Sequence, residues 1–199
     1  FSVAYFWKDL SQWIFDGKYF VDLAGVADPN TGIVPENSGA TGSGKVNGGD
    51  GTISGYELSV SFPFKIVHES LDGFGLIASY TGVDSDMKNP DGNDFKLPGL
   101  SESILNVTSY YEKNGFQARI SMRKRDDFKG DVYGIGFDTQ QVDILGETIV
   151  DAQIGYDFGE AGYKNLEGLS IFLQGYNLTE EPFTSLQGDN ALQVRDYQD

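Results

Sequence analysis

The sequence predicts an all-β protein, an antiparallel up-and-down meander of about seven strands that forms part of a transmembrane β-barrel. Apolar and polar residues alternate in short segments, as in strands whose two faces meet different surroundings. Long and short connections alternate between these segments, and barrels of the outer-membrane type have short turns at one end and long loops at the other. Aromatic residues gather at the segment ends, and charged residues occupy the middle of the polar faces, where a wet lumen accepts them.

Composition excludes several classes of protein. The net charge is −16 with no basic stripe, which argues against a nucleic-acid partner. The sequence has no run of about 18 apolar residues, so a transmembrane helix is excluded. It also has no cysteine, which removes disulfides, thiolate metal sites and cysteine nucleophiles. A hydrophobic content of 39% still suits a barrel, because only every second residue of a barrel strand is apolar.

Seven segments have the period of two that a strand requires. They span residues 2–14, 52–64, 74–83, 103–112, 116–127, 148–158 and 169–178. In the first three, one face carries Val3, Tyr5 and Trp7, then Tyr56, Leu58, Val60, Phe62 and Phe64, then Phe74, Leu76, Ala78 and Tyr80. In the last four, it carries Leu105, Val107 and Tyr111, then Phe116, Ala118, Ile120 and Met122, then Val150, Ala152, Ile154, Tyr156 and Phe158, then Leu169, Ile171 and Leu173.

The meander makes two structural predictions. The long connections 16–50, 84–96 and 128–146 and the tail after Thr179 should lie at one end of the sheet, with the turns 67–72, 113–115 and 159–168 at the other. One side of the sheet should carry Tyr56, Leu58, Val60, Phe62, Ala118, Ile120, Ala152 and Ile154, and the opposite side Glu57, Ser59, Arg119 and Asp151.

Alternation alone leaves two architectures open. In a soluble sandwich the apolar face is the core, whereas in a membrane barrel it meets lipid and the polar face lines the lumen. A secreted or surface β-sandwich that binds carbohydrate is therefore the alternative to the barrel. Such a sandwich would stay soluble without detergent, because its apolar face is buried.

Candidate site residues fall into three groups. Tyr19, Phe20, Tyr133 and Phe137 stand in predicted loops and could stack on sugar rings or pack within the loops. Arg119, Arg123 and Arg125 share a strand face and could bind an anionic substrate or pair with Glu57, Glu112 and Asp151 on neighbouring strands. Asp84, Asp86 and Asp91 crowd oxygen atoms into one segment, but their spacing differs from that of an EF-hand loop, so a flexible acidic loop is favoured over calcium.

The sequence shows no motif of a catalytic site. His68 is the only histidine, it stands in a predicted turn, and nothing near it resembles a nucleophile elbow. No carboxylate pair is marked as that of a glycosidase. We expect no catalytic residue, no resident metal and no cofactor.

Five segments resemble the barrel of TonB-dependent outer-membrane receptors, especially the subgroup of bacteria that scavenge glycans. The similar segments are Ile53-Ser54-Gly55-Tyr56-Glu57-Leu58-Ser59-Val60, Leu71-Asp72-Gly73-Phe74-Gly75-Leu76-Ile77-Ala78-Ser79-Tyr80-Thr81, Leu97-Pro98-Gly99-Leu100-Ser101, Tyr110-Tyr111-Glu112-Lys113-Asn114-Gly115-Phe116-Gln117-Ala118-Arg119 and Gly175-Tyr176-Asn177-Leu178-Thr179. Together they cover most of the chain, and their order and spacing make the match specific.

The resemblance implies a location, a function and partners. The family's receptors have a 22-stranded barrel and an N-terminal plug; residues 1–199 would be the C-terminal portion of such a barrel, without the plug and the last strand. The implied function is uptake of a scarce nutrient, an oligosaccharide or a siderophore-like chelate, across the bacterial outer membrane. The implied partners are that small ligand, membrane lipid and a TonB-type energy-coupling protein that acts through the plug. A sheet with two open edges and one apolar face is also expected to self-associate.

Overall fold

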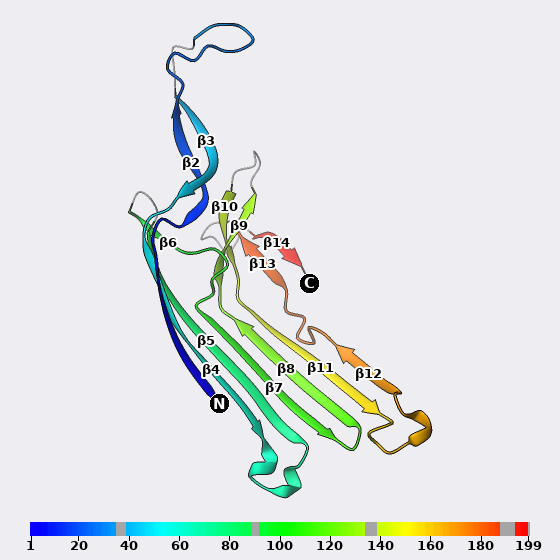
Figure 1. The fold of residues 1–199 in the computed structure, drawn as a ribbon. Helices are drawn as coiled ribbons and strands as arrows, with labels where there is room; N and C mark the ends of the chain where they lie inside the picture. The colour runs from blue at the N-terminus through cyan, green and yellow to red at the C-terminus, as the bar shows by residue number, and fades with distance from the viewer. Residues whose placement is uncertain (35–38, 89–91, 134–138, 188–193, 199) are drawn as a thin grey trace.

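A single long sheet dominates the fold of this computed structural model (Figure 1). The structure describes residues 1–34, 39–88, 92–133, 139–187 and 194–198. Seven strands form an antiparallel meander in the order β1-β4-β5-β7-β8-β11-β12, which confirms the predicted topology. They span Ser2–Leu10, Gly51–Pro63, Phe74–Lys88, Ser103–Lys113, Phe116–Arg125, Glu147–Asp157 and Ser170–Gly175. In the described residues, the only helices are three 3₁₀ turns, at Phe64–Ile66, Glu69–Leu71 and Lys164–Leu166.

The two ends of the sheet differ as predicted. The turns between β4 and β5, β7 and β8, and β11 and β12 lie together at the lower end of Figure 1, and the longer connections lie at the upper end. The Lys113-Asn114-Gly115 turn is tight because Asn114 and Gly115 both adopt positive φ, at 52° and 80°. Such a two-residue reversal joins strands without splaying them.

The long connections contain paired strands, which corrects the prediction that they are loops. Residues 16–50 contain most of a two-stranded ribbon, β2 (Ile14–Asp22) paired with β3 (Gly39–Asn47). Residues 128–146 contain the hairpin of β9 (Phe128–Tyr133) and β10 (Thr139–Ile144), and β13 (Phe183–Leu186) and β14 (Val194–Gln198) extend it to a four-stranded sheet. The two-residue strand β6 (Asp94–Phe95) pairs with the end of β5, which continues five residues beyond its predicted end at Val83.

The pairing register sorts side chains onto two faces as predicted. Leu58 pairs with Tyr80, and Ala118 pairs with both Tyr111 and Ile154, so these side chains share one surface, which we call the apolar face. It carries Val3, Tyr5, Tyr56, Leu58, Val60, Phe62, Ala78, Tyr80, Val107, Ala118, Ile120, Ala152, Ile154 and Leu173. Residues such as Glu57, Ser59, Arg119 and Asp151 point to the other side, the polar face. Leu58 and Arg119 therefore lie on opposite faces.

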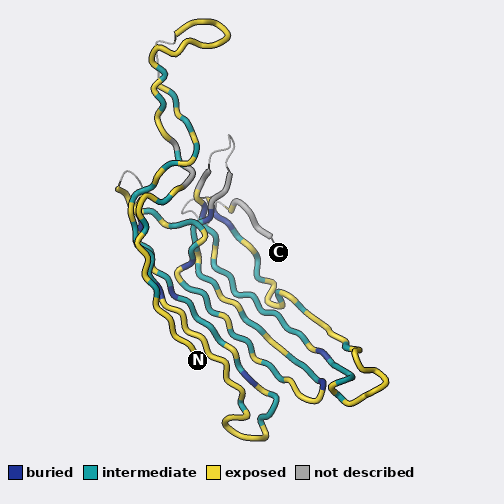
Figure 2. Tube along the Cα trace, in the orientation of Figure 1, coloured by how far each residue is buried: buried dark blue, intermediate teal, exposed yellow. Residues whose placement is uncertain are grey.

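The apolar face is uncovered. Leu58 is 41% exposed and Leu173 is 72% exposed, and in the described part of the chain no second sheet packs on them (Figure 2). The side chains that are almost completely buried, Met87, Val142 and Ser185, lie at the end with the long connections. The sheet is open, because β1 pairs only with β4 and β12 only with β11 among the described strands. A soluble sandwich would bury this face, so the architecture is not the alternative one.

Aromatic rings border the apolar face at both of its ends, near the short turns and toward the long connections. Near the short turns, Phe74 contacts Tyr111 at 4.5 Å between ring centroids, and Tyr111 contacts Phe116 at 5.9 Å. Toward the other end, Tyr56 lies 5.7 Å from Tyr80. From Tyr56 to Phe62 a strand rises about 20 Å. This is an apolar band between two aromatic rows, the pattern of a barrel wall that spans a membrane.

One ion cluster ties two short turns together. Asp72, in the β4–β5 turn, binds Lys65 at 3.1 Å and Lys113 of the β7–β8 turn at 3.1 Å. The hydrogen bonds from these two lysines hold the pKa of Asp72 below its usual range. The cluster thereby links neighbouring hairpins at this end of the sheet.

We expect this cluster to make stability depend on pH. Because the pKa of Asp72 is lower in the folded than in the unfolded chain, the stabilisation is complete above about pH 3.9 and disappears as the pH falls through the folded value. Asp72→Asn should therefore lower the unfolding temperature slightly at pH 7 and by less at pH 2, measured by thermal unfolding in detergent. Glu69→Gln in the same turn is the control; an equal loss at pH 2 and pH 7 would contradict the ion-pair origin.

Candidate functional site

Polar side chains form hydrogen bonds between neighbouring strands on the polar face. Asn106 donates to Ser79 at 3.3 Å, the hydroxyls of Thr108 and Ser121 lie 2.9 Å apart, and Gln174 donates to Gln153 at 3.1 Å. Such pairs stabilise a sheet modestly and leave further donors and acceptors free. The polar face therefore presents a hydrogen-bonding wall that suits water and polar ligands.

A hollow of about 190 Å³ lies in this wall, across β8, β11 and β12. Its lining residues are Arg119, Ser121, Asp151, Ala152, Gln153, Gln174 and Tyr176. Arg119 and Gln153 are direct cross-strand partners, and Gln153 is paired in turn with Gln174. The register of three neighbouring strands thus brings these groups together.

The three candidate arginines do not form one cluster. Arg119 and Arg125 share the polar face, but six residues of strand separate them by about 20 Å. Arg125 donates to Ser101 Oγ at 2.6 Å and to the Gly99 carbonyl at 2.9 Å, and its guanidinium lies 3.6 Å from the Phe128 ring centroid. It therefore anchors the loop before β7.

The ion-pair partners of the arginines also differ from those predicted from the sequence. Arg123 pairs with Glu147, its Nη2 lying 2.8 Å from Oε1, rather than with Glu57, Glu112 or Asp151. Asp151 instead accepts a backbone hydrogen bond from Asn177 at 2.9 Å. The partner is decided by the register between β8 and β11, which places Glu147 opposite Arg125 and within reach of Arg123.

The aromatic candidates Tyr19 and Phe20 lie on the β2–β3 ribbon. A Cβ on Gly42 would stand 2.7 Å from the Tyr19 ring, and one on Gly39 would stand 2.6 Å from the Phe20 ring, so each ring covers a glycine. Being consecutive in a strand, the two rings point to opposite faces and form no shared stacking surface. Tyr133 ends β9, and Phe137 lies outside the described residues.

The acidic candidates Asp84 and Asp86 lie in β5 rather than in a loop, and Asp91 lies outside the described residues. Lys88 lies 3.8 Å from Asp86 and also pairs with Asp94. The hydrogen bond from Lys88 lowers the pKa of Asp94, and that of Lys88 is raised in return. Within the described ranges no three carboxylates or imidazoles gather in a way that could hold a metal ion.

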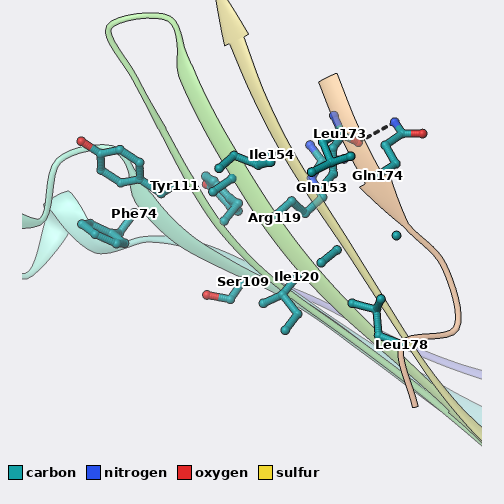
Figure 3. Close-up of a pocket in the computed structure, with 14 residues that line it drawn as sticks. Phe74, Ser109, Tyr111, Arg119, Ile120, Gln153, Ile154, Leu173, Gln174 and Leu178 are labelled. Atoms are coloured by element: carbon teal, nitrogen blue, oxygen red, sulfur yellow. Dashed lines mark hydrogen bonds between the residues drawn. The ribbon is translucent and has the colours of Figure 1, made fainter. Parts of the chain in front are cut away.

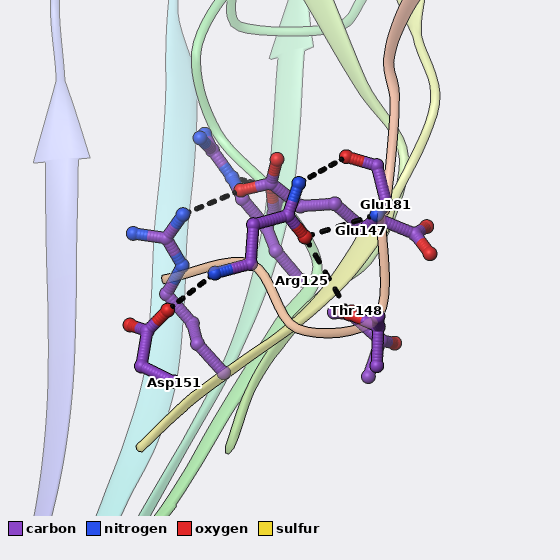
Figure 4. A network of polar contacts seen from close by, with 9 residues as sticks. Arg125, Glu147, Thr148, Asp151 and Glu181 are labelled. Carbon is purple, nitrogen blue, oxygen red and sulfur yellow. Dashed lines mark hydrogen bonds and ion pairs between the residues drawn. The ribbon is translucent and has the colours of Figure 1, made fainter. Parts of the chain in front are cut away.

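Asn177 is a structural residue that the sequence analysis did not identify as such. It has a positive φ of 48°, its side-chain amide donates to the Glu181 carbonyl at 3.1 Å, and its side-chain oxygen accepts from the Glu181 N–H at 2.9 Å. Its own N–H donates to Asp151 at 2.9 Å. Figure 4 labels Asp151 and Glu181, two of the residues that Asn177 contacts. Asparagine tolerates this backbone conformation better than most residues. The residue therefore fixes the exit of β12 against β11.

We expect Asn177→Ala to destabilise the barrel by about 1–3 kcal/mol, from lost hydrogen bonds and a strained positive φ. Asn177→Gly is the matched variant, because glycine accepts the φ but lacks the hydrogen bonds. Urea unfolding of the protein in lipid vesicles should rank the alanine variant below the glycine variant. Wild-type stability of both variants would contradict the assigned role.

A second depression lies on the apolar face (Figure 3). It measures about 610 Å³, and Phe74, Tyr111 and Leu178 stand around small side chains such as Ala118 and Ala152. Arg119, Gln153 and Gln174 also line it, although the pairing register turns their side chains to the polar face. An apolar lining of this kind suits hydrocarbon rather than a polar ligand. The depression is therefore part of the lipid-facing surface, and the polar face is the candidate functional surface.

Comparison with known families identifies the sheet. The family model of the TonB dependent receptor-like β-barrel matches residues 1–178, which include the whole meander from β1 to β12. Comparisons with curated proteins and with solved structures give no significant match. No helix in the described part of the chain has the length and apolarity needed to cross a membrane. The chain therefore belongs to the TonB-dependent receptor-like β-barrel family, whose members are transporters of the bacterial outer membrane.

Proposed function

We propose that the protein takes up an oligosaccharide across the outer membrane, as the C-terminal portion of a receptor barrel. The observation that carries the proposal is the two-faced sheet: an apolar band bordered by aromatic rings opposes a polar wall rich in hydroxyl, amide and charged groups. In a family of outer-membrane barrels, the polar face lines the lumen through which a ligand passes.

The polar face favours an oligosaccharide over a siderophore-like chelate with anionic groups. Two of its three arginines are occupied, Arg123 by Glu147 and Arg125 by Ser101 and Gly99. The chain has 30 acidic and 14 basic residues, and such an excess repels anions. Neutral hydroxyl groups meet no such penalty and match the amides and hydroxyls of this wall.

Uptake of this kind also requires the family's two other components. A ligand too large to diffuse needs an energy source, and the family implies a TonB-type partner that acts through a plug domain. We expect collapse of the inner-membrane potential to stop uptake without changing ligand binding at the cell surface.

A gene deletion tests the proposal. A bacterium that lacks the full-length receptor should lose growth on oligosaccharides of the preferred kind as sole carbon source, and regain it when the wild-type gene is restored. Growth on ferric chelates as the sole iron source should remain normal. A defect on the iron chelates with normal growth on oligosaccharides would show the proposed ligand to be wrong.

A further inference from the structure

The hollow of about 190 Å³ on the polar face has more hydrogen-bonding capacity than its own side chains use. The Tyr176 hydroxyl donates to Gln174 at 2.5 Å, and Gln174 donates to Gln153 at 3.1 Å. Each amide has two N–H donors and two acceptor lone pairs, so this chain of contacts leaves several of them open. Those open positions point into the lumen from β11 and β12.

Arg119 adds donors to the same hollow. Within the described part of the chain, no hydrogen bond or ion pair engages its guanidinium, and its neighbours Gln153 and Tyr110 are uncharged. A guanidinium offers five donors in a fixed plane. This arginine therefore differs from Arg123 and Arg125, each of which already uses at least one donor within the protein.

Charge in the hollow is balanced. Arg119 contributes one positive charge and Asp151 one negative charge, and the other lining side chains are neutral. Asp151 already accepts the Asn177 N–H through one oxygen, which leaves the other oxygen as an acceptor. An anionic group would face Asp151 without a second free arginine, whereas an uncharged group with hydroxyls meets donors and acceptors of both kinds.

Tyr176 supplies an apolar surface beside these polar groups. Its side chain is 72% exposed, and its hydroxyl is held by Gln174, which limits the orientation of the ring. The C–H faces of a sugar ring pack on such an aromatic ring while its hydroxyls bind at the edge.

We propose that Arg119, Asp151, Gln153, Gln174 and Tyr176 form a subsite in the lumen wall for one residue of an uncharged oligosaccharide. The proposal rests on the uptake function proposed above and narrows it to ligands without carboxylates. Gln153 and Gln174 bind hydroxyls, Arg119 and Asp151 bind the same ring from its other side, and Tyr176 packs on its face.

Calorimetric titration of the full-length receptor in detergent tests the subsite. The probes are linear tetramers of glucose, mannose and xylose, with a galacturonic acid tetramer as the charged counterpart. At least one neutral tetramer should bind and exceed the charged one. Gln174→Ala and Arg119→Gln should each weaken that binding about tenfold, the loss of one to two hydrogen bonds, one of them from a charged donor.

Asn165→Ala is the matched control, because it removes an exposed amide from the β11–β12 turn, outside the polar face, and its affinity should equal that of the wild type. Heat-modifiable electrophoretic mobility confirms that each variant is folded. Failure of all neutral tetramers to bind, tighter binding of the charged tetramer, or wild-type affinity in both hollow variants would overturn the subsite. If deletion cells lose growth on oligosaccharides while both variants bind normally, uptake stands and this subsite alone is wrong.

Discussion

The substitution Leu58→Lys should destabilise the receptor by about 2–4 kcal/mol. That is the cost of a basic side chain at the bilayer midplane on the lipid face of a barrel. Leu58 lies between the aromatic residues Tyr56 and Phe62 on the apolar face, and 41% of it is exposed. In the membrane this exposure is contact with lipid, which cannot solvate an ammonium group. Urea unfolding of the full-length receptor in phospholipid vesicles measures the loss.

Ser59→Lys is the matched control for this prediction. Ser59 is the next residue in β4, so its side chain points to the polar face, where it lies 2.8 Å from the Ser2 hydroxyl. The lysine side chain is solvated there, and the substitution removes one hydrogen bond, which lowers the free energy of unfolding by about 1 kcal/mol. Equal losses in the two variants would show that the two faces do not meet different surroundings.

The sequence predicted the membrane-facing part of the fold well, because alternation acts within each strand. Leu58 and Arg119 were assigned to opposite faces from their positions alone, and the pairing register agrees. A one-residue error in either strand would have reversed the assignment. The apolar band is therefore encoded locally, residue by residue.

The extensions at the other end were missed because their strands lack this alternation. Gly39–Asn47 has three glycines and one large apolar residue, and its pairing with β2 depends on rings from the partner strand. Tyr19 covers Gly42, for example. Glycine in a strand weakens it unless a neighbouring ring covers the gap. Such a cross-strand contact is invisible to a reading of one segment at a time.

The site was predicted only in part, for a related reason. Alternation placed Arg119, Arg123 and Arg125 on one face, but it gave neither their separation along the strand nor their partners. Glu147 was selected by the register between β8 and β11, and Ser101 by the path of the loop before β7. The hollow around Arg119 depends on three strands, so no single segment indicates it.

Residues 1–199 alone should not remain a monomer in water without detergent. Their accessible surface is 13781 Å², whereas a compact protein of 21.8 kDa exposes about 9,300 Å². The exposed surface includes the apolar face, and β1 and β12 also present backbone groups unpaired within the described sheet. Exposed apolar patches of this extent associate, and free strand edges pair with other chains.

Sedimentation velocity with and without detergent measures this association. In detergent micelles the apolar face is covered, so we expect one discrete species there and larger oligomers or aggregates without detergent. Replacing Leu58, Val60 and Ile154 together by threonine should reduce the association, because all three lie on the apolar face, whereas the same change at the polar-face residues Ile77, Ile104 and Ile149 should have less effect. A compact monomer in plain buffer would contradict the prediction, because it would require the sheet to curl and bury its apolar face as a core.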